Sequence, residues 1–202
     1  TFIHYSVGMV DSPAAPSPAR ERIMAAALEL FARDGFGSTS IKAVAKRAGV
    51  SPALIYTYFE SKDELLRSVF EEGLRDVRST LPVASGSQAD ATTQLEDLIR
   101  QSFAVVEAHQ QLWRLLYALR SQPGVMERLG LQLSEWNQAV EEELIELCRR
   151  LGTSRPELSA KLLFALIDGM NQHRLQDPEG YPTEAVIGAA KELFTKGAAY
   201  DG

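Results

Sequence analysis

The sequence has very little cysteine: one residue, Cys148, in a chain of 202. A single cysteine excludes a disulfide framework within the chain and is typical of a reducing compartment. Cys148 falls at an apolar position of a helical pattern, which favours a buried structural thiol over a redox sensor. The chain also lacks an apolar run of the roughly 20 residues that span a bilayer, and its N-terminus lacks the features of a signal peptide. These absences predict a cytoplasmic protein with no membrane-spanning part.

Motifs for catalysis and metal binding are missing as well. The three histidines, His4, His109 and His173, lie far apart in the sequence and have no cysteine or carboxylate partner at metal-ligand spacing. No glycine-rich phosphate loop, nucleophile elbow or pair of catalytic carboxylates is found, and the acidic run 141–143 fits a solvated helix face. We therefore expect no metal, no cofactor and no enzymatic activity.

Strand-like alternation of apolar and polar residues is also absent. Apolar residues instead recur at spacings of three and four, and prolines fall at segment edges, which predicts an all-α fold. Helices are expected at 18–34, 40–48, 51–59, 61–81, 91–108, 111–121, 125–151, 156–175 and 183–199. Residues 1–17, which end in a stretch rich in proline, serine and alanine, are expected to form a flexible arm.

Several residues mark where these helices begin and end. Ser17 is a candidate N-cap with Pro18 in the first turn after it, and Gly35 supplies the exit from the same helix. Gly49 allows the unusual backbone angle of a tight turn. Ser61 is expected to cap the helix that follows.

Charge is unevenly distributed along the chain. The net charge is −6, which at first argues against a nucleic-acid partner. Residues 1–62 carry +2, however, and residues 63–202 carry −8. A modestly basic head on an acidic body is compatible with a DNA duplex that meets one end only, because screening makes phosphate attraction local. Many domains that do not bind DNA show as much asymmetry.

The two short helices at 40–48 and 51–59 are joined by a turn at Gly49. Helices connected so tightly must cross at a steep angle to share a small core, which leaves the outer face of the second helix available for a major groove. Short helix pairs with glycine turns also occur in bundles that do not bind DNA. The residues that could form the shared core are Ile41, Val44, Ala45, Ala48, Val50, Leu54, Ile55 and Phe59.

A longer string is more specific than this spacing. Residues 28–66 read LELFARDGFGSTSIKAVAKRAGVSPALIYTYFESKDELL, and together with the residues from about 20 they resemble, without a gap, the N-terminal domain of the tetracycline-repressor (TetR) family. The resemblance implies a three-helix helix-turn-helix DNA-binding domain at 18–62. The rest, 63–202, resembles the family only in layout, and the expectation there is an all-helical effector-binding and dimerisation domain.

The resemblance also implies roles for single residues. Pro52, Ala53 and Leu54 match positions that face base edges, with Tyr56 and Thr57 on or near the same surface. Tyr58 and Lys62 match positions that hold phosphates, as do Thr39 and Ser40, while Ser51 opens the second helix. From the residues alone, Tyr56 fits the core as well as it fits the DNA surface, and Lys62 could be a merely solvated lysine. Arg20 and Arg22 fit ordinary helix-surface residues better than an arm that reaches DNA.

The proposed recognition helix carries few polar groups. Pro52, Ala53 and Leu54 offer no side-chain hydrogen-bond donor to a base. Sequence reading is therefore expected to depend on apolar contact with thymine methyl groups, on Thr57 and on DNA shape.

The body is expected to supply a dimer face and a ligand pocket. In the resembled family the last two long helices pair with those of a second copy, which here implies a homodimer through 156–175 and 183–199; burial within one chain is the alternative. The resemblance also implies an effector pocket, although aromatic residues at helical spacing more often belong to a core. Its candidate residues are Phe103, His109, Trp113, Tyr117, Met126, Trp136, Met170, Asn171 and His173.

These features together predict a sequence-specific transcriptional regulator. The leading hypothesis is a homodimeric repressor that binds a palindromic double-stranded operator, is associated with the nucleoid in the cytoplasm, and is released by an unknown small-molecule effector. The alternative is an architectural DNA-binding protein that responds to no effector.

Overall fold

The computed structural model describes residues 17–80, 90–120 and 131–196, with side chains over 17–77, 90–120 and 137–195. Within these ranges the chain forms α-helices and no strand, which confirms the predicted all-α fold. None of the described helices is long and apolar enough to cross a membrane. The helices are α1 (Pro18–Asp34), α2 (Ile41–Ala48), α3 (Pro52–Tyr58), α4 (Lys62–Thr80), α5 (Ala91–Ala108), α6 (Gln110–Arg120), α8 (Leu131–Arg150), α9 (Pro156–Gln176) and α10 (Thr183–Lys196).

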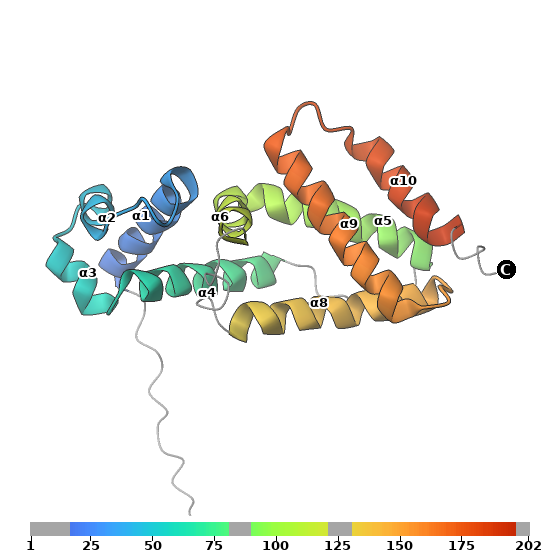
Figure 1. The fold of residues 1–202 in the computed structure, drawn as a ribbon, viewed down its shortest axis with the longest axis horizontal. Helices are drawn as coiled ribbons and strands as arrows, with labels where there is room; N and C mark the ends of the chain where they lie inside the picture. The colour runs from blue at the N-terminus through green and yellow to red at the C-terminus, as the bar shows by residue number, and fades with distance from the viewer. Residues whose placement is uncertain (1–16, 81–89, 121–130, 197–202) are drawn as a thin grey trace, which may run out of the picture.

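The helices form an elongated molecule. Figure 1 shows α1, α2 and α3 grouped at one end, and α5, α8, α9 and α10 at the other. Helix α6 lies between the two groups, and α4 extends from the first group towards the second. The predicted start of the 125–151 helix lies outside the described residues, as do the arm before residue 17 and the 81–89 loop.

The predicted helix ends are confirmed where the structure describes them. The Oγ of Ser17 accepts a hydrogen bond from the Ala19 amide at 3.3 Å, so this serine satisfies a backbone donor that the first turn leaves unpaired. Gly35 and Gly49 have backbone φ values of +86° and +68°, which residues other than glycine rarely adopt. These caps set the bounds of α1 and α2 within a residue of those predicted.

A first core cluster joins the helix-turn-helix to two helices that follow it. Val44, Ala45, Ala48, Ile55 and Phe59 are buried there as predicted, whereas Ile41, Val50 and Leu54 are only partly buried. Helix α1 closes the cluster, and α4 and α6 complete it. The buried residues from those two helices are Leu65, Leu66, Val69, Phe70, Leu74, Val77, Leu112, Leu115, Leu116 and Leu119. This shared core crosses the expected domain boundary at residue 62.

A second core cluster holds the other end together. It joins α5, α8, α9 and α10 through buried residues such as Ile99, Leu144 and Leu163. Cys148 belongs to this cluster and is 0% exposed, and burial raises the pKa of its thiol. The prediction of a buried structural cysteine is therefore confirmed.

The side chain of Leu112 in α6 packs directly against Gly73 of α4. A Cβ atom placed on Gly73 would lie 2.8 Å from both Cδ atoms of Leu112, closer than carbon atoms can pack. A glycine at this position thus leaves room for the Leu112 side chain against α4.

Candidate DNA-binding surface and effector cavity

Helices α2 and α3 form the expected helix-turn-helix. The left-handed turn at Gly49 lets the Val50 amide donate to the Ala45 carbonyl at 3.0 Å, and α3 begins two residues later. Ile55 faces the core from α3. The opposite face of α3 is exposed and includes Pro52, Ala53, Tyr56 and Thr57, with Tyr56 56% exposed. The core reading of Tyr56 is therefore wrong.

Two exposed serines begin these helices. The Oγ of Ser40 accepts from the Ala43 amide at 3.1 Å, and the Oγ of Ser51 accepts from the Leu54 amide at 3.2 Å. In each case the oxygen is the acceptor, so the hydroxyl proton remains available to another partner. These side chains can cap their helices and donate outward at the same time.

Tyr58 and Lys62 sit where α3 meets α1 and α4. The Oη of Tyr58 and the Oγ of Ser17 are hydrogen-bonded at 2.9 Å. The Nζ of Lys62 lies 4.3 Å from the ring centroid of Phe36, a favourable cation–π distance, and donates to the Gly37 carbonyl at 3.4 Å. Burial lowers the pKa of Lys62. Lys62 is therefore held against the protein, and the reading of it as a merely solvated lysine is not supported.

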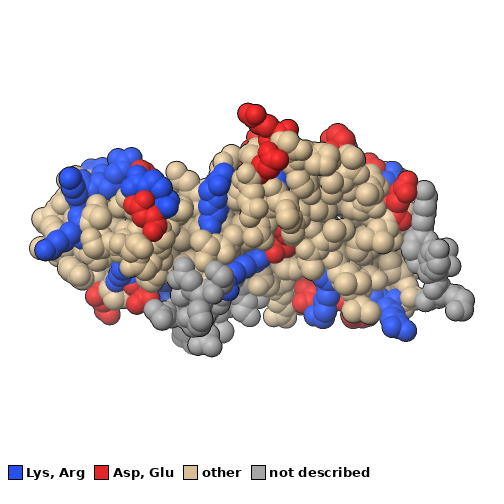
Figure 2. Space-filling view, turned by 45° about the horizontal axis from the view of Figure 1, so that its top comes forward, with Lys and Arg blue, Asp and Glu red and all other residues tan. Residues whose placement is uncertain are grey.

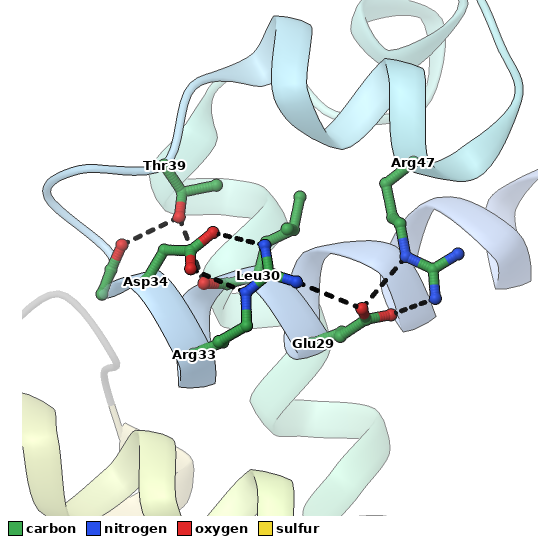
Figure 3. Close-up of polar contacts among 7 residues, drawn as sticks. Glu29, Leu30, Arg33, Asp34, Thr39 and Arg47 are labelled. Carbon is green, nitrogen blue, oxygen red and sulfur yellow. Dashed lines mark hydrogen bonds and ion pairs between the residues drawn. The ribbon is translucent and has the colours of Figure 1, made fainter.

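Thr39 differs from the other expected DNA contacts because it is buried. It is 5% exposed, and its hydroxyl donates to the Gly35 carbonyl at 2.8 Å and to the Leu30 carbonyl at 3.3 Å (Figure 3). Since a hydroxyl has one proton to donate, this side chain stabilises the link between α1 and α2. The expectation of a phosphate contact from its side chain is not supported.

Thr57 has less freedom to read bases than its exposure suggests. Its hydroxyl donates to the Leu54 carbonyl at 2.7 Å. The hydroxyl oxygen can still accept a hydrogen bond and the methyl group can contact a thymine methyl, but the proton is already used.

An ion-pair network holds α2 against α1. Figure 3 shows Arg47 of α2 and Arg33 of α1 converging on Glu29; the Arg47 Nη2 lies 2.6 Å from Glu29 Oε2. Arg33 also donates to its neighbour Asp34 at 2.7 Å, and this hydrogen bond lowers the pKa of Asp34. The network joins α2 to α1 at the surface, outside the core.

Basic side chains gather at this end of the molecule. Figure 2 shows lysine and arginine side chains clustered over the part of the surface formed by α1–α3, with a few acidic side chains beside them, whereas acidic and basic side chains are both scattered over the rest of this face. Lys42, Lys46 and Arg47 of α2 are all exposed. The charge asymmetry predicted from the sequence therefore appears on the folded surface.

A cavity of about 160 Å³ lies between the two core clusters. It is bounded by described residues from five helices, namely α4, α5, α6, α8 and α9. Its lining residues are Leu74, Leu98, Gln101, Ser102, Val105, Val106, Trp113, Leu116, Tyr117, Arg120, Asn137, Val140, Glu143, Leu144, Phe164, Ile167, Asp168 and Asn171.

The cavity brings together only some of the expected effector residues. Trp113, Tyr117 and Asn171 line it. Four other candidates do not line the cavity. Phe103 and Met170 are buried in the second core cluster, His109 ends α5, and His173 is exposed. Met126 and the side chain of Trp136 lie outside the described residues.

Sequence reasoning missed the charged pair in this cavity. Arg120 and Asp168 form an ion pair with 2.5 Å between Nη1 and Oδ2. They are 48 residues apart, and each alone is indistinguishable from a solvated helix-surface charge. The Arg120 guanidinium also lies 5.3 Å from the centroid of the Tyr117 ring. Burial first, and then the nearby Asp168 carboxylate, raise the pKa of Tyr117, so its hydroxyl stays protonated at neutral pH.

Large apolar side chains are exposed on the last two helices. Leu158 and Leu162 of α9 are 49% and 59% exposed, and Leu193 of α10 is 61% exposed. Nothing in the described part of the chain covers them.

A helix-turn-helix with an exposed second helix, joined to a helical body with a cavity, is the architecture of a helix-turn-helix transcription regulator with a separate effector domain. Two family models agree: "Bacterial regulatory proteins, tetR family" matches residues 23–69, and "Tetracyclin repressor-like, C-terminal domain" matches residues 86–195. The chain belongs to the TetR family of DNA-binding transcriptional regulators.

Individual relatives agree with this assignment. The HTH-type transcriptional regulatory protein RaaS of Mycobacterium tuberculosis is 32% identical over 157 residues, which cover 75% of this chain and 68% of that protein. A crystal structure of a transcriptional regulator from Rhodococcus sp. Rha1 has a TM-score of 0.73 at 24% identity and covers 88% of this chain and 94% of its own. The regulator FadR of Bacillus subtilis, solved in complex with stearoyl-CoA, has a TM-score of 0.64 at 22% identity and covers 88% and 98%.

Proposed function

We propose that this chain is a homodimeric repressor that binds a palindromic operator and is released by a small molecule bound in the cavity. The observation that carries the proposal is the position of the cavity. Leu74 of α4 and Leu116 of α6 line it, and the same two residues belong to the core cluster that contains the helix-turn-helix. A ligand there would press on the helices that support the DNA-binding end.

The proposed DNA contacts fall into two groups. Hydroxyl protons of Ser40 and Ser51, the hydroxyl of Tyr58 and the ammonium of Lys62 would contact phosphates, which position the protein without reading sequence. The exposed face of α3 would meet the bases in the major groove. Its residues are Pro52, Ala53, Leu54, Tyr56 and Thr57.

The dimer would form through α9 and α10. Exposed leucines on two helices that contact each other are unfavourable in water and are typical of a protein interface. A twofold dimer places two recognition helices on one face of the duplex, so each copy reads half of a palindrome.

Effector release would follow from linkage between the two sites. If an effector lowers the affinity for operator by a given factor, operator must lower the affinity for effector by the same factor. The FadR structure is a complex with stearoyl-CoA, a molecule with a large apolar part, and the cavity here is lined mainly by apolar side chains.

The proposal can be tested by selecting operator sequences from random duplex DNA and measuring binding by fluorescence anisotropy at fixed salt. We expect a palindromic site and a complex that contains two chains. The double variant Leu162→Glu, Leu193→Glu should be monomeric by sedimentation and should bind the selected site much more weakly. The double variant Ala104→Glu, Gln111→Glu, which adds the same two negative charges at exposed positions of α5 and α6, is the matched control and should remain dimeric. A leucine double variant that still dimerises would overturn the proposed interface.

A further inference from the structure

Three buried polar atoms around the cavity have no hydrogen-bond partner among the described residues. They are the indole Nε1 of Trp113, the hydroxyl of Tyr117 and the side-chain Oδ1 of Asn171, and all three residues line the cavity. A buried polar group without a partner costs roughly 1–3 kcal/mol. Three such groups around one cavity therefore mark positions where a bound molecule, either water or a ligand, would supply the missing partners.

The orientation of the Asn171 amide is fixed by its other hydrogen bonds. Asn171 is 4% exposed, and its Nδ2 donates to the Oγ of Ser102 and to the Ile167 carbonyl, both at 3.0 Å. Both amide protons are thus used, and only the acceptor oxygen is free. Ser102 in turn donates its proton to the Ile99 carbonyl at 2.7 Å, so it offers a ligand no donor.

The charges that face the cavity are already balanced. Arg120 is paired with Asp168, so its charge is not free for a ligand carboxylate. The remaining charged lining residue, Glu143, is exposed and keeps contact with solvent. Two donors, from Trp113 and Tyr117, and one acceptor, from Asn171, have no partner by hydrogen-bond geometry. The Asp168 carboxylate lies near the Tyr117 hydroxyl and contributes to its raised pKa, so a ligand would have to compete with Asp168 for that proton.

From this pattern we infer that the effector is an uncharged amphiphile whose polar group both accepts and donates hydrogen bonds, such as a carboxamide or a hydroxyl on an apolar body. The inference rests on the proposed function, because it takes the cavity as the effector site. A carboxylate offers no proton to Asn171, and at Tyr117 it would place a second negative charge near Asp168. An ammonium group offers no acceptor to Tyr117 or Trp113. A carboxamide satisfies both kinds of group at once.

The cavity is large enough to hold a small molecule of this kind. A cavity of roughly 150 Å³ with apolar walls accommodates a benzene molecule, so the 160 Å³ found here suits a six-carbon body. Four probes with the same carbon chain separate the chemistry: hexanamide, hexan-1-ol, hexanoate and hexylammonium. Benzene serves as a probe with no polar group.

The test measures the affinity of each probe for the full-length protein by calorimetry, supported by thermal shift. We expect hexanamide and hexan-1-ol to bind more tightly than hexanoate and hexylammonium. The variant Tyr117→Phe removes one donor and keeps the ring, so it should weaken hexanamide about tenfold, the usual loss for one neutral hydrogen bond, and leave benzene unchanged. Tyr181→Phe, whose ring packs on Phe103 away from the cavity, is the matched control and should bind all probes as the unaltered protein does.

The outcomes separate this inference from the proposed function. Tighter binding of hexanoate or hexylammonium, or equal loss of hexanamide and benzene affinity in Tyr117→Phe, would overturn the neutral class while the cavity remained an effector site. If no probe binds and the selected operator is still bound, both the neutral class and the effector site are overturned, and the DNA-binding part of the proposal stands.

Discussion

The contact between α4 and α6 at Gly73 gives a stability prediction that can be worked out from the structure. A Cβ atom at this position would lie 2.8 Å from both Cδ atoms of Leu112 and 3.3 Å from its Cγ. Leu112 is 4% exposed and is enclosed by the first core cluster, so its side chain has little room to move. We expect Gly73→Ala to lower the free energy of unfolding.

Two opposing effects set the magnitude. Replacing glycine by alanine inside a helix stabilises it by about 1 kcal/mol, whereas adding a carbon to a filled core costs about 1–3 kcal/mol. The net expectation for Gly73→Ala is a loss of roughly 1 kcal/mol. In a protein of this size such a loss lowers the melting temperature by about 2–4 °C.

Urea unfolding of four proteins measures this effect: the unaltered chain, Gly73→Ala, Leu112→Ala and the double variant. Leu112→Ala removes the obstructing atoms, so in that background Gly73→Ala should be neutral or stabilising, and the double-mutant cycle should give a clear coupling energy. If Gly73→Ala stabilises both backgrounds equally, Leu112 is no obstacle and the reasoning is refuted.

Three further substitutions test the DNA-binding end. Lys62→Met should weaken binding to operator and to random duplex alike, and the slope of log K against log salt concentration should become less negative by about one. A loss of affinity confined to operator would contradict a phosphate contact. Ser51→Ala removes the acceptor for the Leu54 amide and should lower the free energy of unfolding by about 1 kcal/mol, measured by urea unfolding with Ser51→Asp as a control that keeps the cap. Arg47→Ala breaks an exposed pair with Glu29 and should lower the free energy of unfolding by less than about 1 kcal/mol, and by less still at high salt because salt screens the pair. A loss that does not shrink as salt rises would contradict an electrostatic contribution from this pair.

The helices were predictable because their ends are encoded locally. Ser17, Gly35 and Gly49 act through their own backbone geometry and their nearest neighbours, so the sequence alone placed the bounds of α1 and α2. The outward face of α3 was also predictable, since a short helix with Ile55 on the inside has only one other side to expose.

The cavity was much less predictable because it depends on how distant helices meet. Trp113 and Phe103 have the same aromatic character and similar helical surroundings, yet only Trp113 lines the cavity. The pairing of Arg120 with Asp168 joins α6 to α9, and no local pattern reveals it. Thr39 shows the same limit at the DNA-binding end, because its burial is decided by packing against α1.

The hydrogen bond between Tyr58 and Ser17 has a consequence for how a phosphate would be held. Ser17 Oγ already accepts from the Ala19 amide, and its own proton is free to go to Tyr58. If Tyr58 donates to a phosphate, the bonds line up in one direction, from the Ala19 amide through Ser17 and Tyr58 to the phosphate oxygen. Each donor in such a relay polarises the next and strengthens it. Hydrogen bonds at the start of α1 would then strengthen a phosphate contact made by Tyr58 at the end of α3.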